Sequence, residues 1–185
     1  MSKESSQSRL TTSQLEDHWR ERQEAATGTV FYPLSIRQMP PWDEICSNLD
    51  WEFHLPDDRH FTSKHHGYFG VYRLIALASE RDLTKPATLN RVAGQDASGT
   101  LYIGESGNLA RRLNELQRSG WGHRHEDSHG AIGMLKQIDR LDFFPNKLGI
   151  ALLFTTLSDT RGVERDLIRC YMNSFGDTPP LNYRL

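Results

Sequence analysis

The segment "GVYRLIAL", residues 70–77, constrains the fold most, because apolar residues occupy both of its alternating sets of positions. Successive side chains of a β-strand point to opposite faces, so this pattern is typical of a central strand that is buried on both sides. The polar stretch "HLPDDRHFTSKHH" precedes this segment. We therefore expect a domain boundary near Gly67, with residues 67–185 forming the main domain.

Strand and helix patterns alternate along the rest of the main domain. Further strands are expected at "TLYIG" (100–104) and "LGIALLFTTL" (148–157). Helices are expected at residues 109–119, 130–141 and 159–175, with Asn108 as the N-cap of the first. A chain of 185 residues is long enough for one ordinary domain and an extension. The pattern predicts an α/β (α+β) fold.

The N-terminal third of the chain is expected to be an extension of this domain. Residues 1–12 are rich in Ser and Gln, which predicts disorder, and residues 13–66 are expected to form a helical extension. A capping-box pattern from Ser13 to Glu16 opens its first helix. The apolar residues of "PPWDEICSNL" (40–49) have the spacing of a second helix.

The composition excludes some classes of protein and leaves others open. A formal net charge of −2 does not by itself indicate a nucleic-acid-binding protein. However, residues 1–66 hold seven Lys/Arg and eleven Asp/Glu, whereas residues 67–185 hold fifteen and thirteen, so the main domain has room for a basic face. No apolar run could span a membrane and no signal peptide is visible, so we expect a soluble, cytoplasmic protein without a membrane partner. The two cysteines lack metal-ligand spacing.

Helical geometry separates the two adjacent arginines of the segment "LARRLNEL" (109–116). With 100° per residue, Leu113 and Leu116 fall within about 40° of Leu109 and define a buried stripe. Arg112 lies about 60° from Leu109 on the shoulder of this stripe, whereas Arg111 lies at about 200°. We therefore expect Arg112 to face the protein and Arg111 to face water.

The last expected helix contains one charge that does not fit its pattern. With Val163 at zero, the apolar residues of the helix span roughly −20° to 140°, and Glu164 lies inside this arc at about 100°. A carboxylate in this position must be paired, protonated or bound to a cation, because an uncompensated buried charge is costly. An inward salt bridge, for example with Arg112, is the structural alternative to a functional role.

Taken together, these residues resemble the GIY-YIG nuclease superfamily. The resemblance is carried in order by "GVY" (70–72), "YIG" (102–104), "ESGNLARRL" (105–113), "VERDLI" (163–168) and "PPLN" (179–182). It covers residues 67–182, and five elements in the correct order are more specific than any single tripeptide. The resemblance implies a small α/β domain in which helices flank a three-stranded antiparallel sheet. It also implies hydrolysis of DNA phosphodiesters with a single divalent cation, Mg²⁺ or Mn²⁺.

The resemblance assigns roles to particular residues of this sequence. The catalytic residues that it implies are Tyr72, Tyr102, Arg112, His129 and Glu164. The two tyrosines would face the scissile phosphate, and Glu164 would be the only carboxylate ligand of the metal. Asn182 would support the site and, with Arg111, belongs to the expected substrate-binding residues.

These side chains suit phosphodiester hydrolysis, which needs a deprotonated water, a neutralised phosphate and a stabilised leaving oxygen. Tyrosine has a pKa of about 10, so Tyr72 needs a nearby cation, either Arg112 or the metal, to act as a general base. Arg112 can direct two N–H groups at phosphate oxygens. Glu164 alone is a sparse ligand set, but Mg²⁺ keeps several waters and often binds one or two carboxylates plus substrate phosphate.

Two features depart from the family pattern. The two signature tyrosines are separated by 29 residues, an unusually long spacing for the family, so residues 78–99 are interpreted as an inserted loop. Its basic residues, which would supply phosphate contacts, are Arg81, Lys85 and Arg91, and a solvated hairpin tip is the alternative. Glu105 follows "YIG" directly and brings a negative charge near the expected phosphate site.

A competing motif lies at residues 125–129, where "HEDSH" matches the H-E-x-x-H signature of zinc metallopeptidases. That signature requires a helix that presents both histidines on one face. Glycines flank the segment at positions 120, 122, 130 and 133, and Asp127 or Ser128 has the character of an N-cap. The five residues thus straddle a helix start, and a polar loop or a DNA-facing histidine cluster fits them better.

The sequence leaves two functions of different class open. One is a catalytically inactive GIY-YIG module that binds DNA without metal. The favoured one is a stand-alone, site-specific endonuclease of restriction or mobile-element type, because no recognisable DNA-reading module is appended. Double-strand cleavage by an enzyme with one site per chain would favour a homodimer.

Overall fold

The computed structural model describes residues 40–57, 67–121, 129–137, 143, 145–155 and 159–182. The disorder expected for residues 1–12 and the capping-box helix expected from Ser13 lie outside the described residues. Within the described part of the chain, no helix has the length and apolar character needed to cross a membrane.

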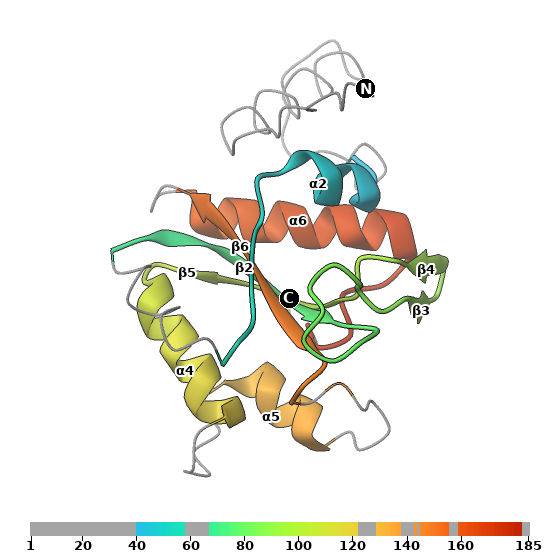
Figure 1. The fold of residues 1–185 in the computed structure, drawn as a ribbon. Coiled ribbons are helices and arrows are strands. Elements are labelled where there is room, and N and C mark those ends of the chain that lie inside the picture. The colour runs from blue at the N-terminus through green and yellow to red at the C-terminus, as the bar shows by residue number, and fades with distance from the viewer. Residues whose placement is uncertain are drawn as a thin grey trace, which may run out of the picture.

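A four-stranded antiparallel sheet forms the centre of the molecule (Figure 1). Its strands are β1 (Glu52–His54), β2 (Phe69–Ala76), β5 (Thr100–Ser106) and β6 (Leu148–Thr155), in the order β1-β6-β2-β5. Strand β2 pairs with β6 on one side and β5 on the other, and seven of its eight residues are buried. The expected central strand is therefore confirmed.

The expectation of a three-stranded sheet is wrong, because β1 adds a fourth strand. Residues 52–54 lie in the segment that was expected to be helical or an extended polar loop, and they pair with Leu152 to Ile150 of β6. The three residues are too few and too polar to carry a strand pattern of their own. Strand β1 exists because β6 offers an unpaired edge, and backbone hydrogen bonding to that edge needs no particular side chains.

Helices cover both faces of the sheet. Figure 1 shows α2 (Trp42–Asn48) and α6 (Thr160–Phe175) on one side, and α4 (Leu109–Trp121) and α5 (Gly130–Gln137) on the other. Each side has its own apolar core. Trp42, Ile45, Ile75, Leu167 and Tyr171 are among the residues of the first core, and Leu74, Leu109, Leu113, Ile132 and Leu152 are among those of the second.

Alternation along β2 decides which side of the sheet each of its side chains faces. Val71 and Ile75 belong to the core beneath α2 and α6, whereas Tyr72 belongs to the core beneath α4 and α5. Arg73 interrupts the apolar pattern on the first side, where its guanidinium lies 4.3 Å from the centre of the Trp51 ring. This cation–π contact offers a buried charge a partner within the core.

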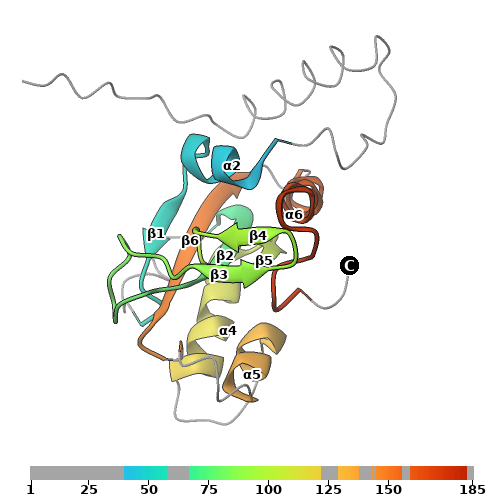
Figure 2. The same ribbon diagram turned by 90° about the vertical axis from the view of Figure 1, so that its right-hand side faces the viewer.

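Residues 78–99, which were interpreted as an inserted loop, contain a second, two-stranded sheet, made of β3 (Leu89–Arg91) and β4 (Gly94–Asp96) (Figure 2). The backbone N–H of Ala93, in the turn between them, donates to the carbonyl of Phe175 at the end of α6. Asp96 is fully buried and accepts hydrogen bonds from the backbone of Thr100 and the hydroxyl of Tyr171. The insertion is therefore a hairpin that packs on the domain.

Candidate functional site

Two tyrosines from neighbouring strands lie side by side on the face covered by α4 and α5. The ring centres of Tyr72 on β2 and Tyr102 on β5 are 5.8 Å apart. Gly104 is the register partner of Tyr72. A Cβ atom at Gly104 would lie 2.5 Å from the Tyr102 ring and 2.7 Å from the Tyr72 hydroxyl, so the glycine makes room for both side chains.

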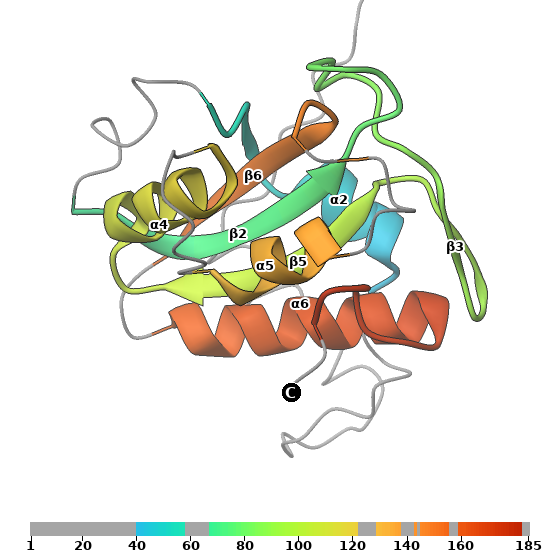
Figure 3. The ribbon, with the colours of Figure 1, turned by 90° about the horizontal axis from the view of Figure 1, so that it is seen from below.

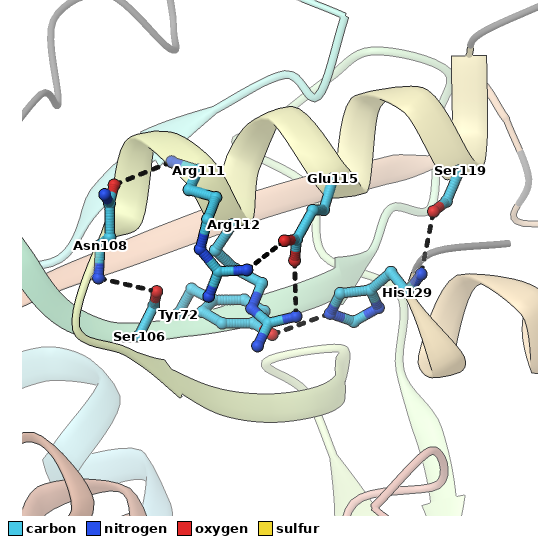
Figure 4. Close-up of polar contacts among 8 residues, drawn as sticks. All are labelled: Tyr72, Ser106, Asn108, Arg111, Arg112, Glu115, Ser119 and His129. Carbon is cyan, nitrogen blue, oxygen red and sulfur yellow. Dashed lines mark hydrogen bonds and ion pairs between the residues drawn. The ribbon is translucent and has the colours of Figure 1, made fainter. Parts of the chain in front are cut away.

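His129 joins the tyrosine pair at the start of α5. Its Nε2 is 2.8 Å from the Tyr72 hydroxyl, and its ring centre is 5.6 Å from that of Tyr102. The His129 backbone N–H donates to the Ser119 hydroxyl on α4 at 3.0 Å, as Figure 4 shows. The start of α5 is thus fixed to α4, and this contact sets the position of the imidazole.

The two arginines of α4 lie as helical geometry predicts. The Arg112 side chain is 28% exposed and the Arg111 side chain is 60% exposed. Both guanidinium groups contact one carboxylate, that of Glu115, and Arg112 Nη1 donates to Glu115 Oε2 at 2.8 Å (Figure 4). Glu115 therefore holds Arg112 on the side of α4 that faces the tyrosines.

The start of α4 is capped as expected. The Asn108 side-chain oxygen accepts a hydrogen bond from the Arg111 backbone N–H at 3.0 Å, and the Ser106 hydroxyl accepts one from the Asn108 backbone N–H. These bonds satisfy donors that a helix start leaves unpaired. They also join the end of β5 directly to α4, so the helix follows the strand in a fixed orientation.

A pocket of about 190 Å³ opens where these elements meet. It is lined by Tyr102, Arg112, His129, Gly130, Ala131, Leu181 and Asn182. Tyr72 is 1% exposed and lies behind the lining residues. Within the described ranges, Arg112 Nε and His129 Nδ1 are buried and lack a hydrogen-bond partner, so both lining residues retain unused polar atoms.

Asn182 completes the pocket from the C-terminal tail. Its side-chain oxygen accepts from the Ile103 backbone N–H at 2.8 Å, and its Nδ2 donates to the Ile103 carbonyl at 2.7 Å. The neighbouring Leu181 N–H donates to the Leu101 carbonyl. The tail therefore pairs with backbone N–H and C=O groups on the outer edge of β5. The supporting role that the resemblance implies for Asn182 stays a prediction.

Glu164 reaches the same edge strand from α6, which runs beside β5 (Figure 3). Its Oε1 accepts a hydrogen bond from the Glu105 backbone N–H at 3.1 Å. Burial and the nearby charge of Glu105 raise the pKa of Glu164 to about 7, against opposing effects of Arg161 and Arg112. Arg112 acts on it only as a nearby charge, because the ion pair of Arg112 is with Glu115.

The charge states within the pocket differ from the expected ones. Burial and the neighbouring Tyr102 raise the pKa of Tyr72 well above its usual range, and the opposing charge of Arg112 is the smaller effect. Burial and Arg112 lower the pKa of His129 to about 4. At pH 7 the Tyr72 phenol and the His129 imidazole are both neutral, so of the two expected cations Arg112 by itself does not favour the phenolate. That a bound metal would favour it stays a prediction.

The donor atoms of this region suit a hard divalent cation. Glu164 and Glu105 lie close enough for the charge of one to raise the pKa of the other, and a cation would relieve this repulsion. In the described residues, no group of three or more His, Cys, Asp or Glu side chains gathers as a metal site. A site made of the Glu164 carboxylate, with Glu105 beside it, suits Mg²⁺ better than zinc, because Mg²⁺ keeps much of its water shell and needs few protein ligands.

The basic residues of the insertion lie outside the pocket lining. Arg81 pairs with Asp57 and Lys85 pairs with Asp82. The Arg91 guanidinium donates to the carboxylate of Asp177 and to the Thr178 carbonyl, so it holds the hairpin on the tail. Phosphate contacts by these three residues stay a prediction. Of the "HEDSH" motif, residues 125–128 lie outside the described residues.

Sequence reasoning missed two residues of the site. Glu115 and Ser119 both lie on α4, where the first holds the arginines and the second holds the start of α5. The spacing of Glu115 from Arg111 and Arg112, at i+4 and i+3, was a usable signal for the ion pairs. The Ser119 contact joins two helices across residues 120–128 and has no such local pattern.

Comparisons with protein-family models, with curated proteins and with solved structures found no match to this chain. The functional interpretation therefore depends on the residues themselves.

Proposed function

We propose that this chain is a metal-dependent DNA endonuclease of the GIY-YIG type, which hydrolyses phosphodiester bonds with one divalent cation. The observation that carries the proposal is the convergence of Tyr102, Arg112, His129 and Asn182 on one pocket. Tyr72 lies directly behind them, and Glu164 is close enough to affect the pKa of Tyr72. The four lining residues come from β5, α4, the start of α5 and the C-terminal tail, and packing alone does not require them to share a pocket.

In the proposed reaction each side chain of the pocket has a separate role. Arg112 binds the non-bridging phosphate oxygens through its guanidinium, whose Nε is a buried donor without a hydrogen-bond partner among the described residues. Tyr102 orients the attacking water from the pocket wall. The proton of that water passes to Nδ1 of His129, the ring nitrogen without a partner among the described residues, while His129 Nε2–H donates to the Tyr72 hydroxyl. The charge of the bound phosphate raises the basicity of the imidazole.

Glu164 is the residue that would hold the divalent cation. A divalent cation held there would supply neutralisation of the phosphate charge and stabilisation of the leaving oxygen. Metal affinity is expected to be weak without DNA, because one carboxylate supplies few of the ligands and the phosphate must supply others.

Cleavage of supercoiled plasmid and of branched DNA tests the proposal. The purified chain is incubated with Mg²⁺, Mn²⁺ or EDTA, beside Arg112→Ala and Glu164→Ala and the exposed control variant Arg118→Ala. We expect cleavage that needs metal, is lost in the first two variants and is kept in the control. Cleavage that persists in EDTA, or that proceeds at the wild-type rate in both Arg112→Ala and Glu164→Ala, would contradict the proposal.

A catalytically inactive DNA-binding module is the second candidate. The Glu115 carboxylate already accepts a hydrogen bond from the Arg112 guanidinium, and Glu105 places a negative charge beside Glu164. Both features oppose the binding of a phosphate. This candidate predicts DNA binding that is independent of metal, with no cleavage of any DNA tested. If cleavage occurs, products of defined sequence would support the site-specific, restriction or mobile-element type.

A further inference from the structure

Three arginines form a row along α6 on the solvent side of the candidate site. Arg161, Arg165 and Arg169 follow one another at a spacing of four residues, and their side chains are 89%, 55% and 32% exposed. With 100° per residue and Val163 at zero, they lie at about 160°, 200° and 240°. We call these three residues the α6 arginine row.

Arg161, the first residue of the row, lies on the flank of α6 that adjoins Glu164, and Arg165 and Arg169 follow it round to the side of the helix that points away from the sheet. Glu164 is at about 100° on the same scale, between the sheet and the first arginine of the row. The opposite flank of the helix meets α2, where the Ser174 hydroxyl, at about 20°, accepts from the Trp42 backbone N–H. A strand of DNA that leaves the pocket past the edge of β5 and Glu164 would therefore meet the α6 arginine row next.

The ion pairs described for the row lie near the surface. Arg165 and Arg169 both contact the carboxylate of Asp166, at 3.0 Å and 3.6 Å. Arg161 Nε lies 3.7 Å from Glu105, which already has the carboxylate of Glu164 as a neighbour. Exposed ion pairs of this kind contribute about 0–1 kcal/mol, so a phosphate can displace them.

The length of the row fits a nucleic-acid backbone. A four-residue step along an α-helix advances by about 6 Å, so the row spans about 12 Å. Phosphates of one strand of B-DNA are about 3.4 Å apart along the axis, so this length covers three to four of them. Guanidinium groups bind phosphates through paired N–H donors.

We propose that the α6 arginine row binds the phosphates next to the scissile linkage and sets the path of the DNA strand, without reading its sequence. The inference rests on the proposed nuclease function and adds the surface on which the substrate lies. Phosphate contacts supply affinity that depends on salt, and in a chain with a net charge of −2 such contacts come from local groups of basic residues like this row.

The test measures the binding of a fluorescently labelled duplex to the full chain by anisotropy, in EDTA, over a series of salt concentrations. The variants are Arg161→Gln, Arg165→Gln and Arg169→Gln, singly and combined. The control is Arg118→Gln, an equal loss of charge at an exposed position in the last turn of α4, on the other side of the sheet. Thermal unfolding of each variant checks that the fold is kept.

Replacing an arginine that contacts a phosphate is expected to reduce the magnitude of the slope of log K against log salt by about 0.9. The slope of the triple variant should therefore be smaller in magnitude than that of the wild type by about 2.7. In cleavage assays KM rises while kcat at saturating DNA is kept. Asp166→Asn, which releases two arginines from their shared carboxylate, should tighten binding. The control variant should keep the wild-type slope.

Two failures are distinguishable. A wild-type chain that neither binds nor cleaves DNA overturns the proposed function and the row with it. A wild-type chain that cleaves DNA, with a triple variant whose salt slope and KM equal those of Arg118→Gln, overturns the α6 arginine row alone.

Discussion

Glu164 carries a stability cost that its proposed role as a cation ligand would explain. Its carboxylate is half-buried at the edge of β5, beside the charge of Glu105, and its pKa of about 7 leaves it largely protonated below neutral pH. A protein selected only for stability would not keep a charge there. The residue is consistent with a cation site, because a bound cation would reverse both effects that raise the pKa.

Glu164→Gln is expected to stabilise the chain at pH 8 and to change it little at pH 5. The folded pKa of about 7 lies above the ordinary value of 4.5, so the folded state binds more protons between these values. The contribution of Glu164 to stability therefore falls as the pH rises through this window, and glutamine removes that loss. Tm measured at both pH values checks this, with the exposed Glu80→Gln as control. An equal effect of Glu164→Gln at both pH values would contradict it.

Gly104→Ala is expected to destabilise the fold and to reduce activity, because the new Cβ collides with both tyrosines. Overpacking of this kind costs about 1–3 kcal/mol. The matched control is Gly162→Ala on α6, where a Cβ atom meets nothing within 4 Å and should stabilise the helix by about 0.8–1 kcal/mol. Urea unfolding of both variants gives the two free energies. Equal effects would show that Tyr72 and Tyr102 are not held as described.

At the scale of the element, α4 organises the site more than any other segment. It begins at a cap joined to β5, carries the arginine pair and its carboxylate along one turn, and anchors the start of α5 near its end. Its apolar stripe is fully buried against the sheet. Arg112 is therefore aimed by a rigid helix rather than by a loop.

Glu115→Gln is expected to lower kcat by about 10-fold to 100-fold, because Arg112 loses the partner that fixes it and small displacements of a catalytic group are costly. KM for DNA should change less. In an Arg112→Ala background the same substitution should have almost no further effect, because the two residues act as a pair. Steady-state cleavage kinetics on the four variants of this cycle measure the coupling, and additive effects would contradict the positioning role.

At the scale of the whole molecule, the part of the chain before the expected boundary near Gly67 is integral to the fold. Strand β1 extends the main sheet, and α2 lies beside α6. Trp42, Ile45, Leu49 and Trp51 belong to the same core as Ile75, Leu167 and Tyr171. Residues 40–57 therefore supply one strand of the sheet and part of the helical layer on the side of α6.

Removal of residues 1–66 is expected to abolish cooperative folding. The truncated chain loses four large apolar side chains, and each of them normally contributes about 1.5–3 kcal/mol by burial. Arg73 would also lose its contacts with Trp42 and Trp51 and would be left as an unpaired charge. Near-UV circular dichroism and urea unfolding report the outcome. A truncated chain whose urea midpoint of unfolding equals that of the full chain would contradict this prediction.

The candidate site was partly predictable. Local periodicity located Arg111, Arg112 and Glu164 correctly, because a helix fixes the direction of each side chain relative to its buried stripe. The cap at Asn108 followed from residue type for the same reason. In contrast, the neutral state of Tyr72 and His129 depends on burial by elements far away in the sequence, which no local pattern contains.

By itself, the sequence determined the main strands and helices of residues 67–182 and the faces that they bury, because these depend on the period of the backbone. Only the tertiary structure decided that a fourth strand joins the sheet, that Arg91 holds the hairpin, and that Glu115 holds Arg112. Each of these depends on which unpaired edge or charge lies nearby in space. Folding brings those partners together, and it also sets the local dielectric that governs their charges.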